Sequence, residues 1–314
     1  MKRFCKQIFA RGANWFLVAL LSIALALTAC TPSEQIPPKP ECIFDDSPDP
    51  RLICFNETPE RIISLAPSNT EILFALGLGD KVVGVTEYCD YPPEALEKEK
   101  VGGPWTPDVE KIVALQPDLI LASDANPFDI ITTLEGLELT VFGIKSTDLD
   151  DVLNDIRTVG EITDTEVEAL ALTSEMAVGI QSVTDQTEEL EQRPRVFYIV
   201  WHEPLQTVGS GEFVHELIEK GGGVNICGNL TGWPIISIEE VVARNPEVII
   251  TSSWPGVYEW AMNETALNTT DARQNGRVFA CDDNLVQRPG PRLPKGLEWF
   301  AHFIHPEIFE DPED

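Results

Sequence analysis

One stretch of the chain occurs twice, and this duplication constrains the fold more than any other feature. WTPDVEKIVALQPDLILAS covers residues 105–123, and WPIISIEEVVARNPEVIITS covers residues 233–252. Aligned without a gap on Glu110 and Glu239, the copies share a glutamate, a valine, an alanine, a proline and a serine. Each copy predicts a loop after its tryptophan, a short helix with the glutamate in its first turn, a proline turn and an apolar strand. We therefore expect two similar lobes.

Strand and helix patterns alternate around these copies. Before the first copy lie a predicted strand at 61–65, a helix at 71–78 opened by a capping-box spacing at 68–71, and a strand at 82–85. This order at short spacing favours parallel strands, and it begins again at residue 195. The predicted fold class is α/β, with two lobes that each contain a central, mostly parallel sheet flanked by helices.

A long helical segment separates the two halves. A helix is predicted at 148–161, and a second runs from a capping-box spacing at 163–166 to about residue 192. At 1.5 Å per residue, its roughly 29 residues span about 40 Å, enough to bridge both lobes as one long α-helix. The alternative is two shorter helices broken at Gly179. The expected organisation is an N-terminal lobe at 58–147, a helical connector at 148–193 and a C-terminal lobe at 194–314.

The beginning of the chain has the pattern of an export signal. Residues 1–29 contain four basic and no acidic residues, with an apolar run at 15–27 followed by Leu-Thr-Ala before Cys30. Small residues before a cysteine favour lipid attachment at Cys30 over a simple cleavable signal or a transmembrane anchor. We expect a lipid-anchored protein outside the cytoplasmic membrane, periplasmic or at the cell surface, whose residues 30–57 form a proline-rich tether and a hairpin.

The acidic composition argues against one class of partner. The formal net charge is −30, and removal of the four positive charges of the signal leaves −34. Such a surface repels nucleic acid and anionic lipid headgroups, so no nucleic-acid partner is expected. Solubility in an external or saline medium is a sufficient explanation of the acidity.

Five cysteines follow Cys30. Cys42 and Cys54 flank a turn-forming Asp-Asp-Ser-Pro-Asp-Pro segment, so a disulfide across a hairpin is predicted. No metal site is expected there, because a second Cys/His pair is missing. The odd number leaves at least one of the five thiols, which also include Cys89, Cys227 and Cys281, free or in an intermolecular disulfide.

The sequence contains no pattern of catalytic residues. None of its four histidines belongs to an HExxH motif, and no Gly-x-Ser-x-Gly elbow occurs. Gly209-Ser210-Gly211 lacks the lysine and hydroxyl residue of a phosphate-binding loop. We therefore do not expect an enzyme. Two alternatives of other classes are an anchored enzyme that uses His202 or Cys89, and a structural envelope protein without a cleft.

Aromatic residues gather in loops that follow predicted strands or precede predicted helices. They are Tyr88, Trp105, Trp201, Trp233 and Trp254. Ligands bind at the carboxyl ends of strands in open parallel sheets, and tryptophans suit a large flat ligand with polar edges. Each tryptophan alone is equally consistent with packing of its own loop. As a set drawn from both lobes, they predict a ligand-binding cleft.

RIISLAPSNTEILFALGLGDKVVGVTEYCDYPPEA, GGPWTPDVEKIVALQPDLILAS, the connector and WPIISIEEVVARNPEVII together resemble one known family. They resemble the periplasmic binding proteins that serve ABC importers of cobalamin, siderophores and haem, and the resemblance covers the chain from about residue 58 onward. It implies two α/β lobes bridged by one long helix and ligand binding in the cleft, without catalysis. The transported ligand would be the only bound small molecule, with no other cofactor and no metal.

The resemblance also implies a membrane partner. In this family one exposed glutamate on each lobe docks onto arginine pockets of a dimeric permease, which works with its ATPase, and these glutamates match Glu110 and Glu239. A helix N-terminus stabilises such a carboxylate, and arginine pairs with it in a bidentate manner. The protein itself is expected to be a monomer.

Within the family, three ligand classes are open. The segment 87–93 with Tyr88, together with Trp105 and Trp233, resembles the cobalamin-binding members, so a corrinoid is the predicted ligand. An anionic siderophore needs cleft arginines, for which Arg288 and Arg292 are the candidates, and haem needs an iron ligand such as Tyr88 or His202. The predicted ligand-binding residues are Tyr88, Trp105, Trp201, His202, Trp233, Trp254 and Arg288.

Overall fold

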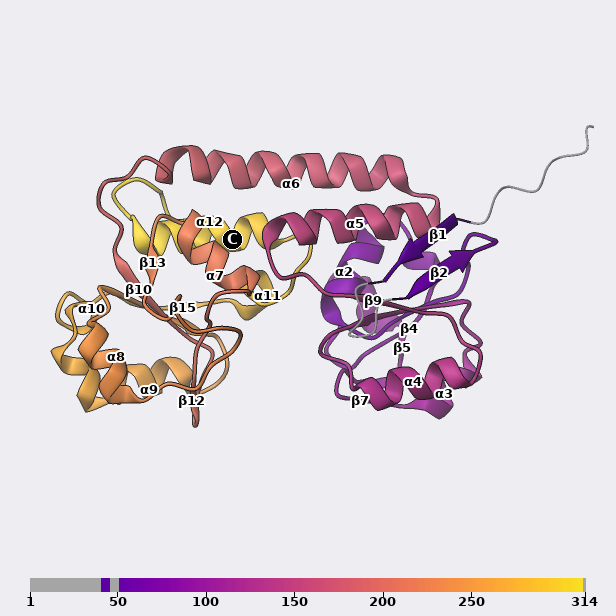
Figure 1. Ribbon diagram of the computed structural model, residues 1–314, viewed down its shortest axis with the longest axis horizontal. Helices are drawn as coiled ribbons and strands as arrows, with labels where there is room; N and C mark the ends of the chain where they lie inside the picture. Colours follow the sequence, from indigo (N-terminus) through magenta and orange to yellow (C-terminus); the bar gives the residue numbers. More distant parts are fainter. Residues whose placement is uncertain (1–40, 46–50, 313–314) are drawn as a thin grey trace, which may run out of the picture. The chain divides into compact units, whose positions relative to one another are not determined.

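The computed structural model describes residues 41–45 and 51–312. Its two lobes each contain one parallel β-sheet (Figure 1). The predicted signal, the lipid-attachment residue Cys30 and the tether up to residue 40 lie outside this range, so they stay predictions. In the N-terminal lobe the strand order is β5 (Glu99–Lys100), β4 (Val82–Val85), β3 (Ile62–Ser64), β8 (Leu119–Ser123) and β9 (Val141–Ile144). In the C-terminal lobe it is β13 (Val224–Asn225), β10 (Arg195–Ile199), β14 (Val248–Ser252) and β15 (Val278–Cys281).

The duplicated stretches occupy equivalent places in the two sheets. All strand pairs in both sheets are parallel. The strand of copy one, β8, lies between β3 and β9, and the strand of copy two, β14, lies between β10 and β15. The structure therefore confirms the predicted fold class, with two similar α/β lobes.

Eleven α-helices and several short elements complete the described residues. The helices are α2 (Pro67–Ala75), α3 (Val109–Ala114), α4 (Phe128–Gly136), α5 (Leu149–Thr163), α6 (Glu166–Thr187), α7 (Phe213–Lys220), α8 (Ile238–Arg244), α9 (Val257–Asn263), α10 (Asp271–Gln274), α11 (Asp283–Val286) and α12 (Leu293–Ile304). The short elements are β6 (Gly102–Gly103), β7 (Thr106–Pro107), β11 (Trp201–His202), β12 (Leu205–Gln206), and the 3-10 turns η1 (Gly79–Lys81), η2 (Pro93–Glu97) and η3 (Thr265–Thr269). None of the helices among these residues is long and apolar enough to cross a membrane.

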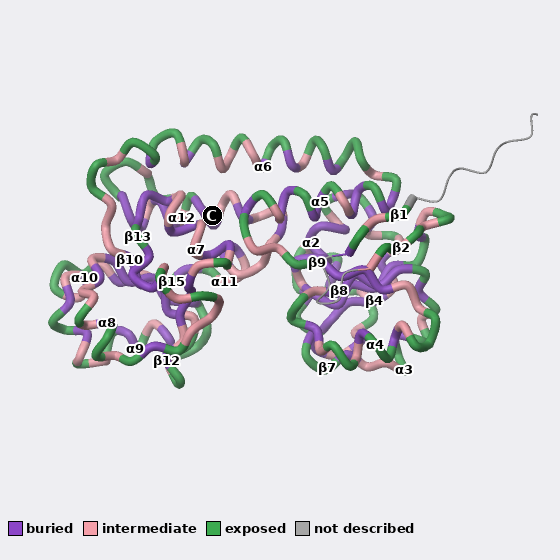
Figure 2. The backbone as a smooth tube through the Cα atoms, in the orientation of Figure 1, coloured by how far each residue is buried: buried purple, intermediate pink, exposed green. Residues whose placement is uncertain are grey.

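Both sheets are buried on both faces, as Figure 2 shows for their central strands. In β8, Leu119 and Leu121 face one hydrophobic cluster, whereas Ile120 and Ala122 face another. Strand β10 alternates in the same way between two clusters. Burial on both faces explains why these strands are continuous apolar runs in the sequence rather than alternating patterns. One of these clusters contains residues of both lobes together with α5, α6 and α12.

The long second helix of the connector, α6, is continuous and extends across both lobes. Helix α6 has 22 residues, which corresponds to about 33 Å, and it packs against α5 and α12 (Figure 1). The alternative break at Gly179 is wrong. A Cβ atom at Gly179 would lie 3.1 Å from Cβ of Pro294, and one at Gly160 would lie 2.5 Å from Cβ of Ala169. Both glycines therefore allow close helix packing.

Several predicted helix boundaries and both predicted capping boxes are wrong. Helix α6 ends at Thr187, five residues before the predicted end. Thr163, the predicted capping residue, is the last residue of α5 and donates its hydroxyl to the Val159 carbonyl, and Thr165 precedes α6 without a side-chain capping hydrogen bond. Helix α2 begins at Pro67, where proline needs no N–H partner, so the predicted capping box at 68–71 lies inside the helix.

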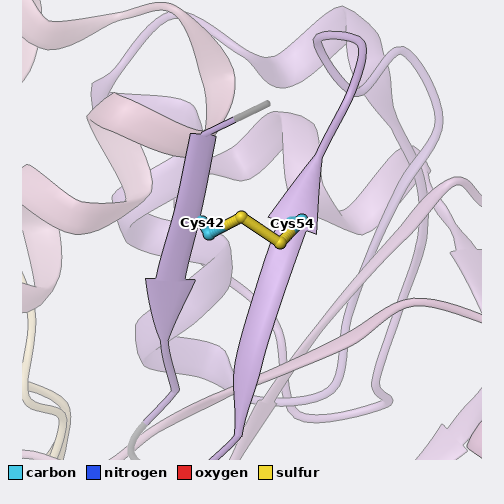
Figure 3. Close-up of a disulfide and its surroundings, with 2 residues drawn as sticks. All are labelled: Cys42 and Cys54. Carbon is cyan, nitrogen blue, oxygen red and sulfur yellow. A yellow bond between two sulfur atoms is a disulfide. The ribbon is translucent and has the colours of Figure 1, made fainter. Parts of the chain in front are cut away.

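A disulfide closes the hairpin that precedes the N-terminal lobe (Figure 3). The hairpin consists of β1 (Glu41–Phe44) and β2 (Leu52–Phe55), and its register places Cys42 opposite Cys54. These two residues form the predicted bond. Ile43, Ile53 and Phe55 of the hairpin pack against the hydrophobic core. The disulfide therefore attaches the start of the described chain to the N-terminal lobe.

Removal of this disulfide should lower stability. The two cysteines are 12 residues apart. A cross-link over such a loop lowers the conformational entropy of the unfolded chain and thereby stabilises the folded protein by about 3 kcal/mol. We expect the Cys42→Ala/Cys54→Ala variant to lose roughly that free energy of unfolding in urea. Reductant should lower the stability of the wild type and leave the variant unchanged, and a variant as stable as the wild type would contradict the structural role.

Candidate functional site

A cavity of about 610 Å³ lies at the carboxyl ends of the strands of both sheets. Its N-terminal side comes from the segments after β3, β4, β8 and β9, and its C-terminal side from the segments after β14 and β15 together with the start of α7. This volume is typical of small-molecule sites. The lining includes Ser68, Asn69, Glu87, Tyr88, Asp90, Trp105, Asp124, Ser146, Glu212, Phe213, Trp233, Ser253, Trp254, Asp283, Asn284, Gln287 and Arg288.

Four of the five predicted aromatic residues line this cavity. Tyr88 and Trp105 belong to the N-terminal lobe, and their rings meet edge to face with centroids 5.6 Å apart. Trp233 and Trp254 belong to the C-terminal lobe. Tyr88, Trp105 and Trp254 are 44%, 58% and 45% exposed, so much of each ring is free to contact a ligand. The structure thus brings aromatic faces from both lobes to one cavity.

Trp201 and His202 do not line the cavity. The chain turns back directly after β10 as the β11–β12 hairpin, and the Trp201 indole donates a hydrogen bond to the Glu203 carbonyl at 2.8 Å. The His202 ring stacks on Trp260 of α9 at 5.8 Å. Their predicted place in the lining is therefore wrong, because the hairpin holds them against α9.

Cys89 is also absent from the lining. Its thiol is buried and lies 3.0 Å from Oγ1 of Thr70 and 3.1 Å from Oγ1 of Thr86. Burial raises its pKa despite these hydrogen bonds, so the reactive thiolate is disfavoured. Cys89, Cys227 and Cys281 are all free and buried, which is the arrangement of structural thiols.

Carboxylates are the second main component of the cavity, and sequence reasoning missed three of them. Asp124 follows β8, Asp283 follows β15, and Glu212 precedes α7. Burial raises the pKa of Asp124, and it raises that of Glu212 with a further contribution from Asp124. The rule that located the aromatic residues, a position at the carboxyl end of a parallel strand, would have found Asp124 and Asp283 as well.

Asp283 is held by several hydrogen bonds. Its Oδ2 accepts bonds from the backbone N–H and the hydroxyl of Ser253 at 3.0 and 3.2 Å. Its Oδ1 accepts bonds from the Tyr198 hydroxyl at 3.3 Å and from the Gln287 amide at 2.9 Å. Burial nevertheless raises the pKa of Asp283 to about 6, so this carboxyl group changes its charge in the cavity just below neutral pH.

A buried ion-pair network joins the two lobes beside the cavity. Glu71 of α2 is only 2% exposed, and its carboxylate accepts hydrogen bonds from Arg292 at 2.8 and 2.6 Å. Arg288 donates to Glu71 at 3.0 Å and to Asp90 at 2.7 Å. Glu71 therefore pairs with arginines of the other lobe, and it does not cap a helix as its position in the sequence indicated. Neither Arg288 nor Arg292 is a free surface residue.

Glu110 and Glu239 are exposed in the first turns of α3 and α8. The preceding residues Asp108 and Ser237 cap these helices, accepting hydrogen bonds from the N–H groups of Lys111 and Glu240. Among the described residues, neither glutamate forms an ion pair. Figure 1 shows α3 and α8 on the side of their sheets that faces away from α6. The duplicated glutamates are therefore exposed at equivalent places in the two lobes.

Residues 62–285 match the family described as periplasmic binding protein. The chain therefore belongs to the periplasmic binding protein family, as the sequence resemblance indicated. It is similar to an uncharacterized ABC transporter substrate-binding lipoprotein, YvrC of Bacillus subtilis, with 32% identity over 317 residues that cover 96% of this chain and 99% of that protein. It is also similar to a vitamin B12-binding protein of Vibrio cholerae, with 35% identity over 260 residues that cover 81% and 92%.

The fold agrees with a solved structure of the same class. The crystal structure of the periplasmic vitamin B12-binding protein BtuF of Vibrio cholerae has a TM-score of 0.70 and 34% identity, covering 78% of this chain and 96% of that one. These similar proteins are binding proteins rather than enzymes. The comparison thus agrees with a protein that binds a small molecule.

Asp283 should make the stability depend on pH. Its ordinary pKa is 3.8 and its folded pKa is about 6, so the folded protein binds this proton more tightly than the unfolded chain. This contribution to the free energy of unfolding therefore rises as the pH falls from 7 to 5, by about 1 kcal/mol. Urea unfolding at both pH values should show this gain in the wild type. An equal gain in Asp283→Asn, which cannot ionise there, would contradict the assignment.

Proposed function

We propose that the protein is an extracytoplasmic substrate-binding protein of an ABC importer that captures a corrinoid in this cavity. The observation that supports this proposal best is the composition of the lining. Five aromatic side chains from both lobes, the four predicted ones and Phe213, accompany five carboxylates and one arginine that is already paired with Glu71 and Asp90. A corrin is a broad ring with amide groups at its edge. Aromatic faces suit the ring, and carboxylates accept hydrogen bonds from amide N–H groups.

The same lining disfavours the other two ligand classes. Haem carries two propionates, which the carboxylates of the cavity would repel. Of the two candidate iron ligands, His202 is outside the lining and Tyr88 is within it, so it is charge that disfavours haem. Anionic siderophores need an unpaired cation in the site. Arg288 is paired with two carboxylates, and Arg292 is paired with Glu71 and does not line the cavity. A corrinoid agrees better with these charges than either alternative.

The position of Glu110 and Glu239 supports delivery to a permease. Each is an exposed carboxylate near a capped helix N-terminus, on one helix of each lobe. Two such carboxylates suit two arginine sites, as in a dimeric permease that is coupled to its ATPase. In this proposal the protein is a monomer that a lipid at Cys30 holds outside the cytoplasmic membrane, and the similarity to a lipoprotein of Bacillus subtilis supports the anchor. The bound corrinoid is cargo, and no cofactor takes part.

Ligand binding can be tested directly. We expect cyanocobalamin to co-elute with the purified protein in gel filtration, whereas haem and a ferric siderophore should elute separately. Trp105→Ala or Trp233→Ala should weaken cobalamin binding at least about tenfold, because each removes an aromatic contact and its buried area. Trp201→Ala is a matched control outside the cavity and should change the Kd less than about threefold. Absence of co-elution with cobalamin would exclude the proposed ligand.

The docking role predicts a loss of transport without a loss of binding. Glu110→Lys/Glu239→Lys should keep the affinity for cobalamin, because both residues lie outside the cavity lining, but it should strongly reduce cellular uptake. Glu168→Lys/Glu175→Lys reverses two exposed glutamates of α6 and controls for net charge. Uptake is measured with labelled cobalamin in cells that depend on this protein. Uptake by the first variant equal to that of the control would disprove the docking role.

A further inference from the structure

Arg288 is the only residue with a full positive charge in the lining of the cavity, as far as the described residues extend. Its guanidinium is directed to protein acceptors. Nη1 donates to Glu71 Oε1 at 3.0 Å and to Asp90 Oδ1 at 2.7 Å, and Nη2 lies 3.4 Å from the Tyr88 carbonyl oxygen. Burial alone would lower its pKa, but the hydrogen bonds to Asp90 and Glu71 outweigh that effect and raise it. The arginine is thus charged and paired with two carboxylates.

The two carboxylates of this network have different roles. Glu71 forms a bidentate pair with Arg292, through Nε at 2.8 Å and Nη2 at 2.6 Å, and shares only one oxygen with Arg288. Arg292 also lies over the ring of Tyr91, 4.0 Å from its centroid. Glu71 is therefore committed mainly to Arg292, which leaves Asp90 as the counter-ion that balances Arg288. Asp90 is 52% exposed, whereas Glu71 is 2% exposed, so Asp90 can be replaced without emptying a buried position.

We infer that Asp90 is a specificity-determining residue, because it neutralises Arg288 and thereby excludes anionic ligands from the cavity. The inference builds on the proposed function and adds the reason why the Arg288 guanidinium in the lining does not attract an anionic ligand. Without Asp90, two arginines would share the single charge of Glu71. Arg288 would then present an unbalanced guanidinium beside Tyr88, and a guanidinium binds carboxylates in a bidentate manner.

The test compares Asp90→Asn with Glu87→Gln. Glu87 is a matched control, because it is an exposed carboxylate of the same loop and the same lining but forms no ion pair among the described residues. The Kd of haem, the anionic probe, and of cyanocobalamin are measured by quenching of tryptophan fluorescence at low ionic strength. We expect Asp90→Asn to tighten haem binding at least about tenfold, the effect of one charge-assisted hydrogen bond, and Glu87→Gln to tighten it less than about threefold.

A second substitution identifies the group that is responsible. Asp90→Asn/Arg288→Gln should lose the gain in haem affinity, because the guanidinium that would bind the propionate is gone. Equal gains in Asp90→Asn and Glu87→Gln would overturn the inference, since they would show an effect of net charge alone. A gain in haem affinity that persists in Asp90→Asn/Arg288→Gln would also overturn the inference. The proposed function is tested separately: it fails if the wild type does not bind cobalamin. In that case the haem titrations of the variants still measure the effect of Asp90.

Discussion

The buried carboxylate of Glu71 is the interaction on which the arrangement of the cavity depends. A buried charge is costly unless it is paired and hydrogen-bonded, and both cationic partners of Glu71 come from the other lobe, 217 and 221 residues away in sequence. Helix α2 therefore has to meet the segment before α12. This contact joins the lobes directly beside the cavity, where Arg288 also holds the loop that contains Tyr88 and Asp90.

Helix α6 adds a second constraint on the same lobes. It packs against α5 of one lobe and α12 of the other, and close contacts at Gly160 and Gly179 leave little space between these helices. A continuous helix resists bending more than crossing strands do, and movement of the lobes would also have to break the ion pairs of Glu71. We therefore expect a cavity that is largely pre-formed, which suits a rigid macrocyclic ligand because little ordering is needed on binding.

The sequence predicts the features of this protein that depend on local patterns. The duplication, the parallel sheets, the Cys42–Cys54 pairing and the aromatic residues after strands all follow from periodicity, turn residues and position along a strand. The role of Glu71 could not be predicted, because the capping-box spacing at 68–71 is a local pattern. It contains no information on the contact with Arg288 and Arg292, which depends on the tertiary fold. His202 was misplaced for a related reason, since only the β11–β12 hairpin reveals that it packs on α9.

The two copies of the duplicated stretch form similar lobes but different walls of the cavity. In the first, Trp105 meets Tyr88 edge to face, and its glutamate follows five residues later. In the second, the Trp233 side chain lies beside the Glu212 carboxylate and lowers its pKa against the effect of burial, and its glutamate follows six residues later. One wall therefore offers a pair of aromatic rings, and the other offers a tryptophan beside a carboxylate. Divergence has thus affected the ligand side of each copy, whereas the exposed glutamates remain equivalent on α3 and α8. That separation is expected if the two lobes contact different sides of one asymmetric ligand but equivalent sites on a symmetric partner.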